Sequence, residues 1–413
     1  MSDTTDIPGT ETPLFNPFED GYAQWPYDQF ARLREAGPVL PSPLGGWQLF
    51  SYDDCFQLLR EPGTSVEEEN IAEPIFDTAA TAQFARDHGF EPFSNRSILN
   101  IDPPDHTRLR KLVARVFTPR AIERLRPEVQ RLVDEAMRDI GPGDRFDLIA
   151  TLAFPLPFQV ISLMLGMPEG KTEELRGWSH TLAGSLDPIL SDDQMLATLQ
   201  AGQSMRTHLQ EVIAWKRANP ADDLLSAMIE QSDDGDALTD EELLHQLSLL
   251  FIAGHETTVN LIGNGMLQLL RHPEQLGRLR DDAELIGDAV EECLRFDPPV
   301  QMTRRITMAP FEASGHTIEP GTFVMAMTAA ANRDPARWGD NADEFDITRK
   351  GASHHLSFGS GIHHCLGAAL ARMEAQVAIG TLVQRHPGLS LDGEPVHNGR
   401  VVLRGLDELP LRG

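Results

Sequence analysis

Apolar and polar positions alternate along this chain with two different periods. From residue 105 to about 231 the apolar positions recur at helical spacing, whereas the N-terminal third mixes short helical and short extended patterns. Segment 304–327 alternates apolar and polar residues between turn residues, which is typical of strands, and segment 401–411 has the character of a further strand pair. We therefore expect a mainly α-helical fold with small β-sheets.

Several shorter elements are expected in the N-terminal third. Residues 28–37 predict a helix closed by glycine, residues 45–54 a strand entering a turn, and residues 55–63 a short helix. Residues 63–100 predict a long irregular segment, and such a segment in a helical chain is usually functional or mobile.

One helical pattern, from about 239 to 272, is much longer than the others. Thr239 and Glu242 form a capping box, and Pro273 ends the pattern. About thirty helical residues span ~45 Å, the width of a whole domain. The middle of this segment is apolar on nearly every side, so the helix is expected to cross the core.

The centre of this long helix carries the polar sequence AGHETT, residues 253–258. One interpretation is structural, with Gly254 allowing close helix packing and Glu256 forming an ion pair. The other is functional: small residues locally widen or kink the helix beside a ligand, while Glu256 and Thr257 supply a proton path into a dry cavity.

Composition narrows the class of protein. The formal net charge of −28 over 413 residues argues against nucleic-acid binding, since phosphate backbones repel such a surface. Three scattered cysteines are typical of a reducing compartment, and the N-terminus has no apolar run that predicts a signal peptide or membrane anchor. We expect a cytoplasmic protein that does not bind membranes, with a short extension over 1–25 and one large domain over 26–413.

Residues 354–373, HHLSFGSGIHHCLGAALARM, carry four histidines and Cys365. Zinc ligands are usually spaced two to five residues apart, whereas these neighbouring side chains diverge. A helical pattern follows the cysteine, so we expect Cys365 near a helix N-terminus, where a thiolate is favoured. Gly367 leaves room for a bulky partner. The pattern predicts one exposed thiolate facing a large planar ligand.

Several motifs, in this order and spacing, resemble the cytochrome P-450 superfamily of haem-thiolate monooxygenases, most of all its soluble bacterial branch. The resemblance runs from about Pro26 to Leu411, and its motifs are listed here: IDPPDHTRLRKLV (101–113), AGHETT (253–258), the pair Glu292 and Arg295, the turn-rich segment 331–349, and FGSGIHHCLG (358–367).

The resemblance implies roles for individual residues. Cys365 matches the proximal ligand of haem b, and Glu256 with Thr257 matches the acid–alcohol pair that relays protons to oxygen. The haem propionates are expected to meet His106, Arg110, Arg305 and His363. His354, His355 and His364 are interpreted as surface residues.

A further expectation concerns the structural Glu292–Arg295 pair. Many relatives place an arginine before the phenylalanine at the position of Phe345. Here Glu344 stands in its place. Arg349 or Arg337 is therefore the candidate third partner of this pair.

The resemblance also implies external partners. O₂ is the co-substrate, and electrons come from NAD(P)H only indirectly, through a ferredoxin reductase and a ferredoxin. A basic cluster suits docking of an acidic partner, although a solvated helix face is the alternative. It comprises Arg108, Arg110, Lys111, Arg115, Arg120, Arg124 and Arg126, among which Glu123 is the only acid.

The expected substrate is a lipophilic small molecule, because the positions expected to line the pocket are mostly apolar: Leu249, Leu250, Ala253, Val300, Met302, Val401 and Val402. Three other functions stay open. They are a haem-thiolate sensor without turnover, a zinc hydrolase built on the histidine run, and a family member that isomerises or couples its substrate.

Overall fold

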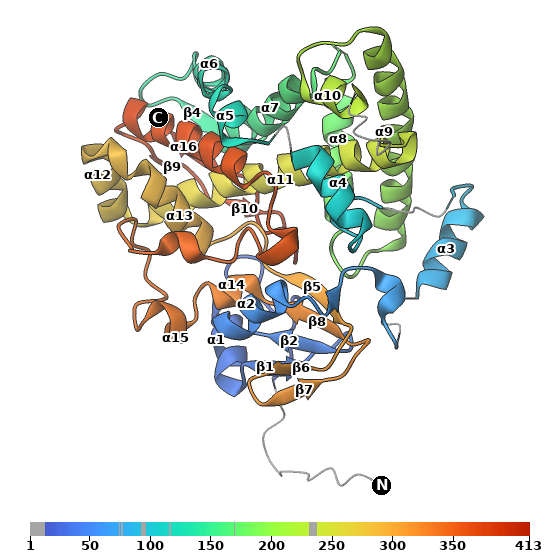
Figure 1. Ribbon diagram of the computed structural model, residues 1–413. Coiled ribbons are helices and arrows are strands. Elements are labelled where there is room, and N and C mark those ends of the chain that lie inside the picture. The colour runs from blue at the N-terminus through green and yellow to red at the C-terminus, as the bar shows by residue number, and fades with distance from the viewer. Residues whose placement is uncertain are drawn as a thin grey trace.

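The computed structural model describes residues 13–73, 75, 77–91, 96–114, 117–168, 170–230 and 238–413. Most of the chain after residue 104 forms helices around one central helix, α11 (Asp240–Arg271) (Figure 1). The other helices of this region are α4 (Asp105–Ala114), α5 (Pro119–Glu123), α6 (Arg126–Ala136), α7 (Pro155–Leu165), α8 (Thr172–Gly184), α9 (Asp192–Ala218), α10 (Leu224–Glu230), α12 (Pro273–Asp281), α13 (Ile286–Phe296), α15 (Pro335–Trp338) and α16 (Ala368–Arg385).

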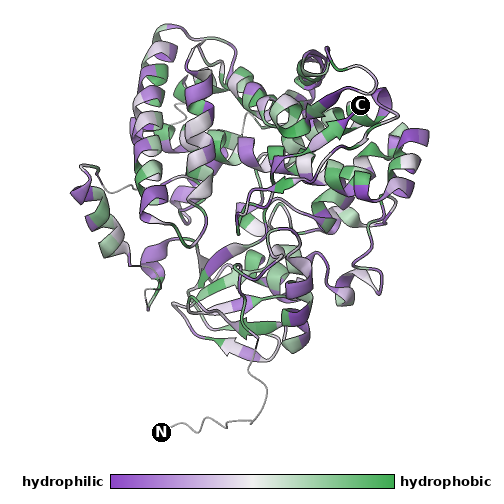
Figure 2. Ribbon diagram, turned by 180° about the vertical axis from the view of Figure 1, so that it is seen from behind, coloured by the Kyte–Doolittle hydropathy of each residue, from purple (hydrophilic) through white to green (hydrophobic). Residues whose placement is uncertain are grey.

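The long-helix prediction is confirmed. Thr239 accepts a hydrogen bond from the Glu242 N–H, and the Glu242 side chain accepts one from the Thr239 N–H, so both halves of the capping box form. The helix continues without interruption to Arg271, before Pro273. It packs against α7, α8, α9, α13 and α16. Figure 2 shows outer helices that carry both hydrophilic and hydrophobic residues, as expected for amphipathic helices around a core.

The largest sheet has five strands in the order β1-β2-β8-β5-β3 and lies with α1 (Tyr27–Ala36), α2 (Tyr52–Arg60) and α14 (Thr328–Ala331) (Figure 1). Strands β2 and β8 run parallel, and the remaining neighbours are antiparallel. The strands are β1 (Val39–Pro41), β2 (Trp47–Leu49), β3 (Thr64–Ser65), β5 (Thr303–Thr307) and β8 (Phe323–Ala326). The extended pattern predicted for 304–327 is thus confirmed.

Three smaller sheets complete the β-structure of the described residues. They pair β10 with β11, β6 with β7, and β12 with both β4 and β9. The predicted C-terminal strand pair corresponds to β11 and β12, which join two different sheets. The strands are β4 (Arg145–Asp147), β6 (Phe311–Ala313), β7 (His316–Ile318), β9 (Ser390–Leu391), β10 (Val396–His397), β11 (Leu406–Glu408) and β12 (Pro410–Arg412).

The segment predicted to be irregular, 63–100, contains a helix. Helix α3 (Thr78–Asp87) begins where the Asp77 side chain accepts a hydrogen bond from the Ala80 N–H. Its many alanines favour helix without giving an apolar face, so the periodic pattern is weak. Positions 74, 76 and 92–95 of this segment lie outside the described residues.

The start of the chain contacts the first helix. Of the extension expected over 1–25, residues 1–12 lie outside the described part. Phe15 and Tyr22 are buried and form an aromatic cluster with Phe30 of α1. Five short helical turns link the larger elements: η1 (Glu68–Asn70), η2 (Ile149–Ala153), η3 (Ala283–Leu285), η4 (Ala352–His354) and η5 (Gly361–His363).

Candidate functional site

Cys365 lies in the loop between η5 and α16 and is exposed. Its backbone N–H donates to the Phe358 carbonyl at 2.8 Å. Gly361 has a φ of +69°, and a Cβ there would lie 2.3 Å from the Leu59 carbonyl oxygen, so the loop packs against α2 only with glycine at this position. A Cβ at Gly367 would meet nothing within 4 Å, which agrees with the expected free space beside the cysteine.

Opposing effects act on the pKa of the free Cys365 thiol. Burial raises the pKa of the Cys365 thiol. The Gly367 N–H and the charges of Arg110 and Arg372 oppose this shift only in part. Gly367 is the N-cap residue of α16, so the N-terminus of this helix acts on the sulfur through the Gly367 N–H.

The four residues expected to meet propionates come from three elements. His106 and Arg110 lie on α4, Arg305 on β5, and His363 in η5. The rings of His106 and His363 are 4.3 Å apart between centroids, and an Arg110 N–H donates to the His364 carbonyl. Burial lowers the pKa of Arg305 to about 10 and that of His363 to about 3, with neighbouring cations adding to the shift of His363. The structure thus brings these residues to the cysteine loop.

The cluster formed by His106, Arg110, Arg305 and His363 fits a dianionic group such as the haem propionates. Both ring nitrogens of the buried His106 have no hydrogen-bond partner. In the described chain, neither Arg110 nor Arg305 has a carboxylate within ion-pair distance, and Arg305 is only 6% exposed. Buried cations normally have an anionic partner. A cavity of about 630 Å³, lined in part by Arg305 and His363, borders the cluster.

On the other side of the candidate site, Glu256 is buried within α11 and is paired twice. Its Oε1 accepts from the Arg400 Nη1 at 2.8 Å, and its Oε2 lies 3.2 Å from the His180 Nδ1. Burial raises the pKa of Glu256, but His180 and Arg400 outweigh it and hold the pKa below its usual range. The carboxylate is therefore ionised and held, as the structural interpretation expected.

Thr257 lies on a different face of α11 from this ion pair. Its hydroxyl donates to the Ala253 carbonyl at 2.7 Å, and Ala253 itself is exposed between the buried Phe251 and His255. A Cβ at Gly254 would approach only Ile161, at 3.9 Å. Helix α11 is continuous through this region. The free space beside it is therefore left by small side chains and not by a kink or an interruption of the helix.

Leu366, next to Cys365, packs against the same apolar clusters as two residues of α11. Leu366 and Leu249 both pack against Ile98, Ile101 and Leu109, and Leu366 and Leu250 both pack against the cluster that contains Phe251. Of the other residues expected to line the pocket, Val300, Val401 and Val402 are partly exposed, whereas Met302 is buried in the core beside the large sheet. The cysteine loop and the turn of α11 before AGHETT thus border the same apolar clusters.

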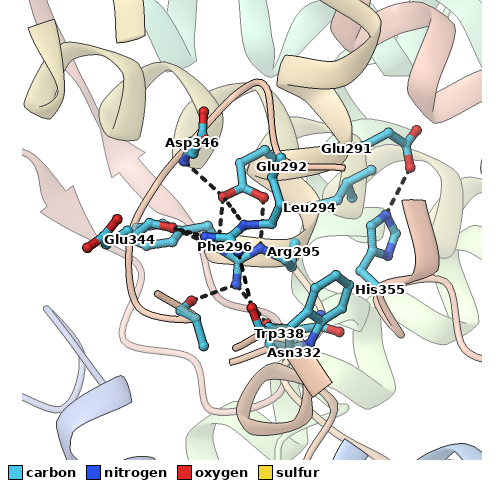
Figure 3. Close-up of polar contacts among 12 residues, drawn as sticks. Glu291, Glu292, Leu294, Arg295, Phe296, Asn332, Trp338, Glu344, Asp346 and His355 are labelled. Atoms are coloured by element: carbon cyan, nitrogen blue, oxygen red, sulfur yellow. Dashed lines mark hydrogen bonds and ion pairs between the residues drawn. The ribbon is translucent and has the colours of Figure 1, made fainter. Parts of the chain in front are cut away.

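Glu292 and Arg295 form a fully buried bidentate pair, with distances of 2.7 and 2.8 Å (Figure 3). Arg349 is the third partner, 3.2 Å from Glu292, so that alternative is confirmed. Arg337 instead lies over the rings of Tyr52 and Trp338. The Glu344 backbone carbonyl accepts from Arg295, so Glu344 contributes without its side chain.

His355 was expected at the surface, and this expectation is wrong. It is buried, and its Nε2 lies 3.2 Å from Glu291 (Figure 3), although the ring is not aligned for a regular hydrogen bond. His354 and His364 are exposed as expected. A helical spacing gives no indication of His355 burial, because the residue lies at the end of a short turn.

Sequence analysis missed four residues around the site: His180, Glu291, Arg372 and Arg400. Each makes its contact across a long separation, such as 144 residues between Arg400 and Glu256. No local pattern indicates such pairs.

Two further findings concern alternatives. In the described ranges, no group of three or more histidine, cysteine or acidic side chains is arranged to hold a metal ion, so the histidine run forms no zinc site there. Among the described helices, none combines the length and apolarity needed to cross a membrane.

Residues 56–395 match the cytochrome P450 family model, and the chain belongs to this family of haem-dependent monooxygenases.

Relatives match over nearly the whole chain. The chain is 41% identical to cytochrome P450 107B1 of Saccharopolyspora erythraea over 97% of this chain and 98% of that protein. It is 40% identical to vitamin D(3) 25-hydroxylase of Pseudonocardia autotrophica, over 97% of each chain. The crystal structure of P450BioI, in complex with an acyl carrier protein that carries hexadec-9Z-enoic acid, aligns with a TM-score of 0.86 at 36% identity, covering 95% of this chain and all of that one.

Proposed function

We propose that this protein hydroxylates or epoxidises a lipophilic small molecule, using haem b bound through Cys365. The observation that carries this proposal is the cluster of His106, Arg110, Arg305 and His363 beside an exposed cysteine. Neither Arg110 nor Arg305 forms an ion pair with a carboxylate in the described chain, although the charge of Asp102 acts on Arg305. These groups would hold the two propionates, and Cys365 would be the axial ligand. Haem ligated by a thiolate supplies O₂ binding and favours O–O cleavage.

We assign proton delivery to Thr257 and Glu256. The Thr257 hydroxyl donates to the carbonyl of the exposed Ala253, so its oxygen is left to accept a hydrogen bond from a group in the site. Glu256 is ionised and buried, and it is linked to partly exposed His180, which provides a route toward solvent. A carboxylate and an alcohol in a dry site are suited to move protons in sequence.

The proposed substrate is a lipophilic small molecule. Leu249, Leu250, Ala253 and Val300 are partly exposed apolar residues, and burial of apolar surface is the main source of affinity in such pockets. A 25-hydroxylase of vitamin D(3) and a protein that binds a tethered hexadecenoic acid are both similar to this chain. Oxygen insertion is favoured over isomerisation or coupling because Thr257 is present.

Electrons are proposed to come from a cytoplasmic ferredoxin, reduced by a ferredoxin reductase from NAD(P)H. Of the basic cluster, Lys111, Arg120 and Arg124 are exposed, Arg108 is paired with Glu242, and Arg115 lies outside the described residues. Arg120→Glu is expected to slow reduction by ferredoxin with unchanged substrate affinity, whereas the same reversal at Arg138 leaves the rate unchanged. Equal rates in the wild type and Arg120→Glu would contradict this docking surface.

The substrate proposal is tested by spectral titration with a panel of terpenoids, steroids, macrolides and fatty acids. Binding that displaces water from the iron shifts its spin state. Each binder is then incubated with ferredoxin, reductase, NADPH and O₂. We expect products heavier by one oxygen atom. Binders that are turned over only to isomerised or coupled products would contradict the proposal.

A further inference from the structure

A second polar cluster, made of residues other than His106, Arg110, Arg305 and His363, packs against the cysteine loop. It consists of Glu291 on α13, His355 in the turn after η4, and Arg372 on α16. We call these three residues the proximal cluster. The Glu292–Arg295 pair does not include them, although Glu291 and Glu292 are adjacent. Figure 3 shows Glu291 directed to His355 and Glu292 directed to Arg295.

Glu291 holds Arg372 with two hydrogen bonds. The Arg372 Nε donates to Oε1 at 2.5 Å and its Nη2 donates to Oε2 at 3.0 Å. The same carboxylate lies 3.2 Å from the His355 Nε2. His355 Nδ1 accepts from the Ser357 N–H at 3.2 Å, so the ring is fixed in the loop that leads to the cysteine. The guanidinium is thus oriented by contacts from two other elements.

This orientation places Arg372 against the cysteine loop. Its Cζ lies 4.5 Å from the centroid of the Phe358 ring. The carbonyl of Phe358 accepts the Cys365 N–H, and the His355 ring lies 5.6 Å from the Phe358 ring. The charge of Arg372 lowers the pKa of the Cys365 thiol, as do, more strongly, the Gly367 N–H and the charge of Arg110. The proximal cluster therefore fixes a positive charge behind Phe358 without hydrogen bonding to the sulfur.

We infer that the proximal cluster positions the Arg372 charge so that it sets the reduction potential of the iron bound at Cys365. The inference rests on the proposed role of Cys365 as the haem ligand. Reduction of the iron adds one negative charge, which a fixed nearby cation stabilises. Glu291 has two opposing effects, since it orients Arg372 and also carries a negative charge close to the same site.

Opposite charges make the inference testable by sign. Arg372→Gln removes the cation, so the potential is expected to fall. Glu291→Gln removes the anion and leaves the Arg372 charge in place, so the potential is expected to rise. At the same solution potential, the ratio of reduced to oxidised protein in each variant should differ from that of the wild type by up to about tenfold, which equals about 59 mV for one electron. Arg372→Lys keeps the charge and is expected to recover most of the wild-type potential.

The matched control is Arg385→Gln, on the same helix. Arg385 is half exposed and pairs with Asp134, so its loss removes the same charge at the far end of α16. Its potential is expected to equal that of the wild type. Potentials are measured by dye-mediated spectroscopic titration, and the ferrous–carbon monoxide spectrum of each variant reports whether sulfur ligation is intact.

Two outcomes overturn the inference. Potentials that shift in the same direction in Arg372→Gln and Glu291→Gln would indicate a packing role only, and so would shifts no larger than in Arg385→Gln. If Arg372→Gln loses the sulfur-ligated spectrum, Arg372→Met serves as the charge-removing variant, and a potential equal to that of the wild type would overturn the inference. A wild-type protein that lacks this spectrum would instead overturn the proposed function, and this inference with it.

Discussion

Arg400 donates to the carboxylate of Glu256 at 2.8 Å and joins the turn before β11 to the centre of the longest helix. Arg400 also donates to the His180 backbone carbonyl, while Asp187 accepts the Val401 and Val402 N–H groups. Three segments far apart in sequence thus meet at one buried carboxylate. Glu256 therefore contributes to stability as well as to the proposed proton path.

Removal of Arg400 is expected to destabilise the protein. Arg400→Met leaves Glu256 buried with only His180, so the free energy of unfolding should fall by about 3 kcal/mol. In the double variant with Glu256→Gln the loss should be smaller, because no unpaired charge stays buried. Urea unfolding of the haem-loaded proteins measures both. An exposed pair, Arg217 with Asp240, is the control, and Arg217→Met should cost about 0.5 kcal/mol. A loss at Arg400 no larger than this control would show that the buried pair contributes little.

Thr257→Ala is expected to uncouple electron use from product formation. Without the hydroxyl at the exposed Ala253 surface, protons reach the site from unordered water, and reducing equivalents leave as hydrogen peroxide. Peroxide released per NADPH consumed is the measurement. Thr258→Ala, which alters the next hydroxyl on a buried face of α11, is the control. Full coupling in Thr257→Ala would remove its proposed role.

Neighbouring arginines on β5 give a sharp test of haem retention. Arg305 is buried and belongs to the cluster with His106, Arg110 and His363. Arg304, by contrast, is partly exposed and pairs with Glu68. A hydrogen bond to a charged group contributes about 1.5–3 kcal/mol, so Arg305→Gln should release haem about 10- to 100-fold faster. Arg304→Gln should release it at the wild-type rate. Haem transfer to an excess of apomyoglobin measures both rates, and equal rates would exclude Arg305 as an anchor.

The buried carboxyl group of Glu374 is expected to make the stability of the protein depend on pH. It is buried in α16, its Oε2 has no partner, and burial raises its pKa to about 8. The folded state therefore binds more protons than the unfolded state between the ordinary value near 4.5 and about 8. The contribution of Glu374 to the free energy of unfolding is therefore fully present below pH 4.5, and it is lost as the pH rises to about 8.

Glu374→Gln should flatten this dependence. The wild type is expected to lose on the order of a few kcal/mol between pH 5 and pH 8, relative to the variant. Thermal unfolding midpoints across this range provide the measurement. Parallel profiles for the two proteins would show that Glu374 is already ionised in the folded state.

Local patterns predicted much of this architecture and part of the site. Thr239 with Glu242 and Pro273 define α11, because capping and termination depend on neighbouring residues. The cysteine motif and the HTRLR motif indicate residues that the fold does bring together, as the His106–His363 contact shows. The roles of these residues in haem binding and catalysis stay predictions.

Other features depend on tertiary contacts and were not predictable. His355 is buried beside Glu291 of α13, and Glu291 is in turn paired with Arg372 of α16. No periodicity in the sequence indicates these contacts. Arg400 lies in an irregular turn, and its partner is on α11. At Cys365, burial raises the pKa of the thiol, while the N–H of Gly367, the N-cap residue of α16, opposes this shift, and the balance of the two depends on tertiary packing.

Ligation of haem iron by the Cys365 sulfur is the central claim. The most direct measurement is the absorption spectrum of the reduced protein under carbon monoxide, for the wild type, Cys365→Ala and the buried-cysteine control Cys55→Ala. We expect the red-shifted Soret band that sulfur ligation produces in the wild type and in Cys55→Ala, and we expect Cys365→Ala to lose this band. A wild type without that band, or a Cys365→Ala protein that keeps it, would contradict the account.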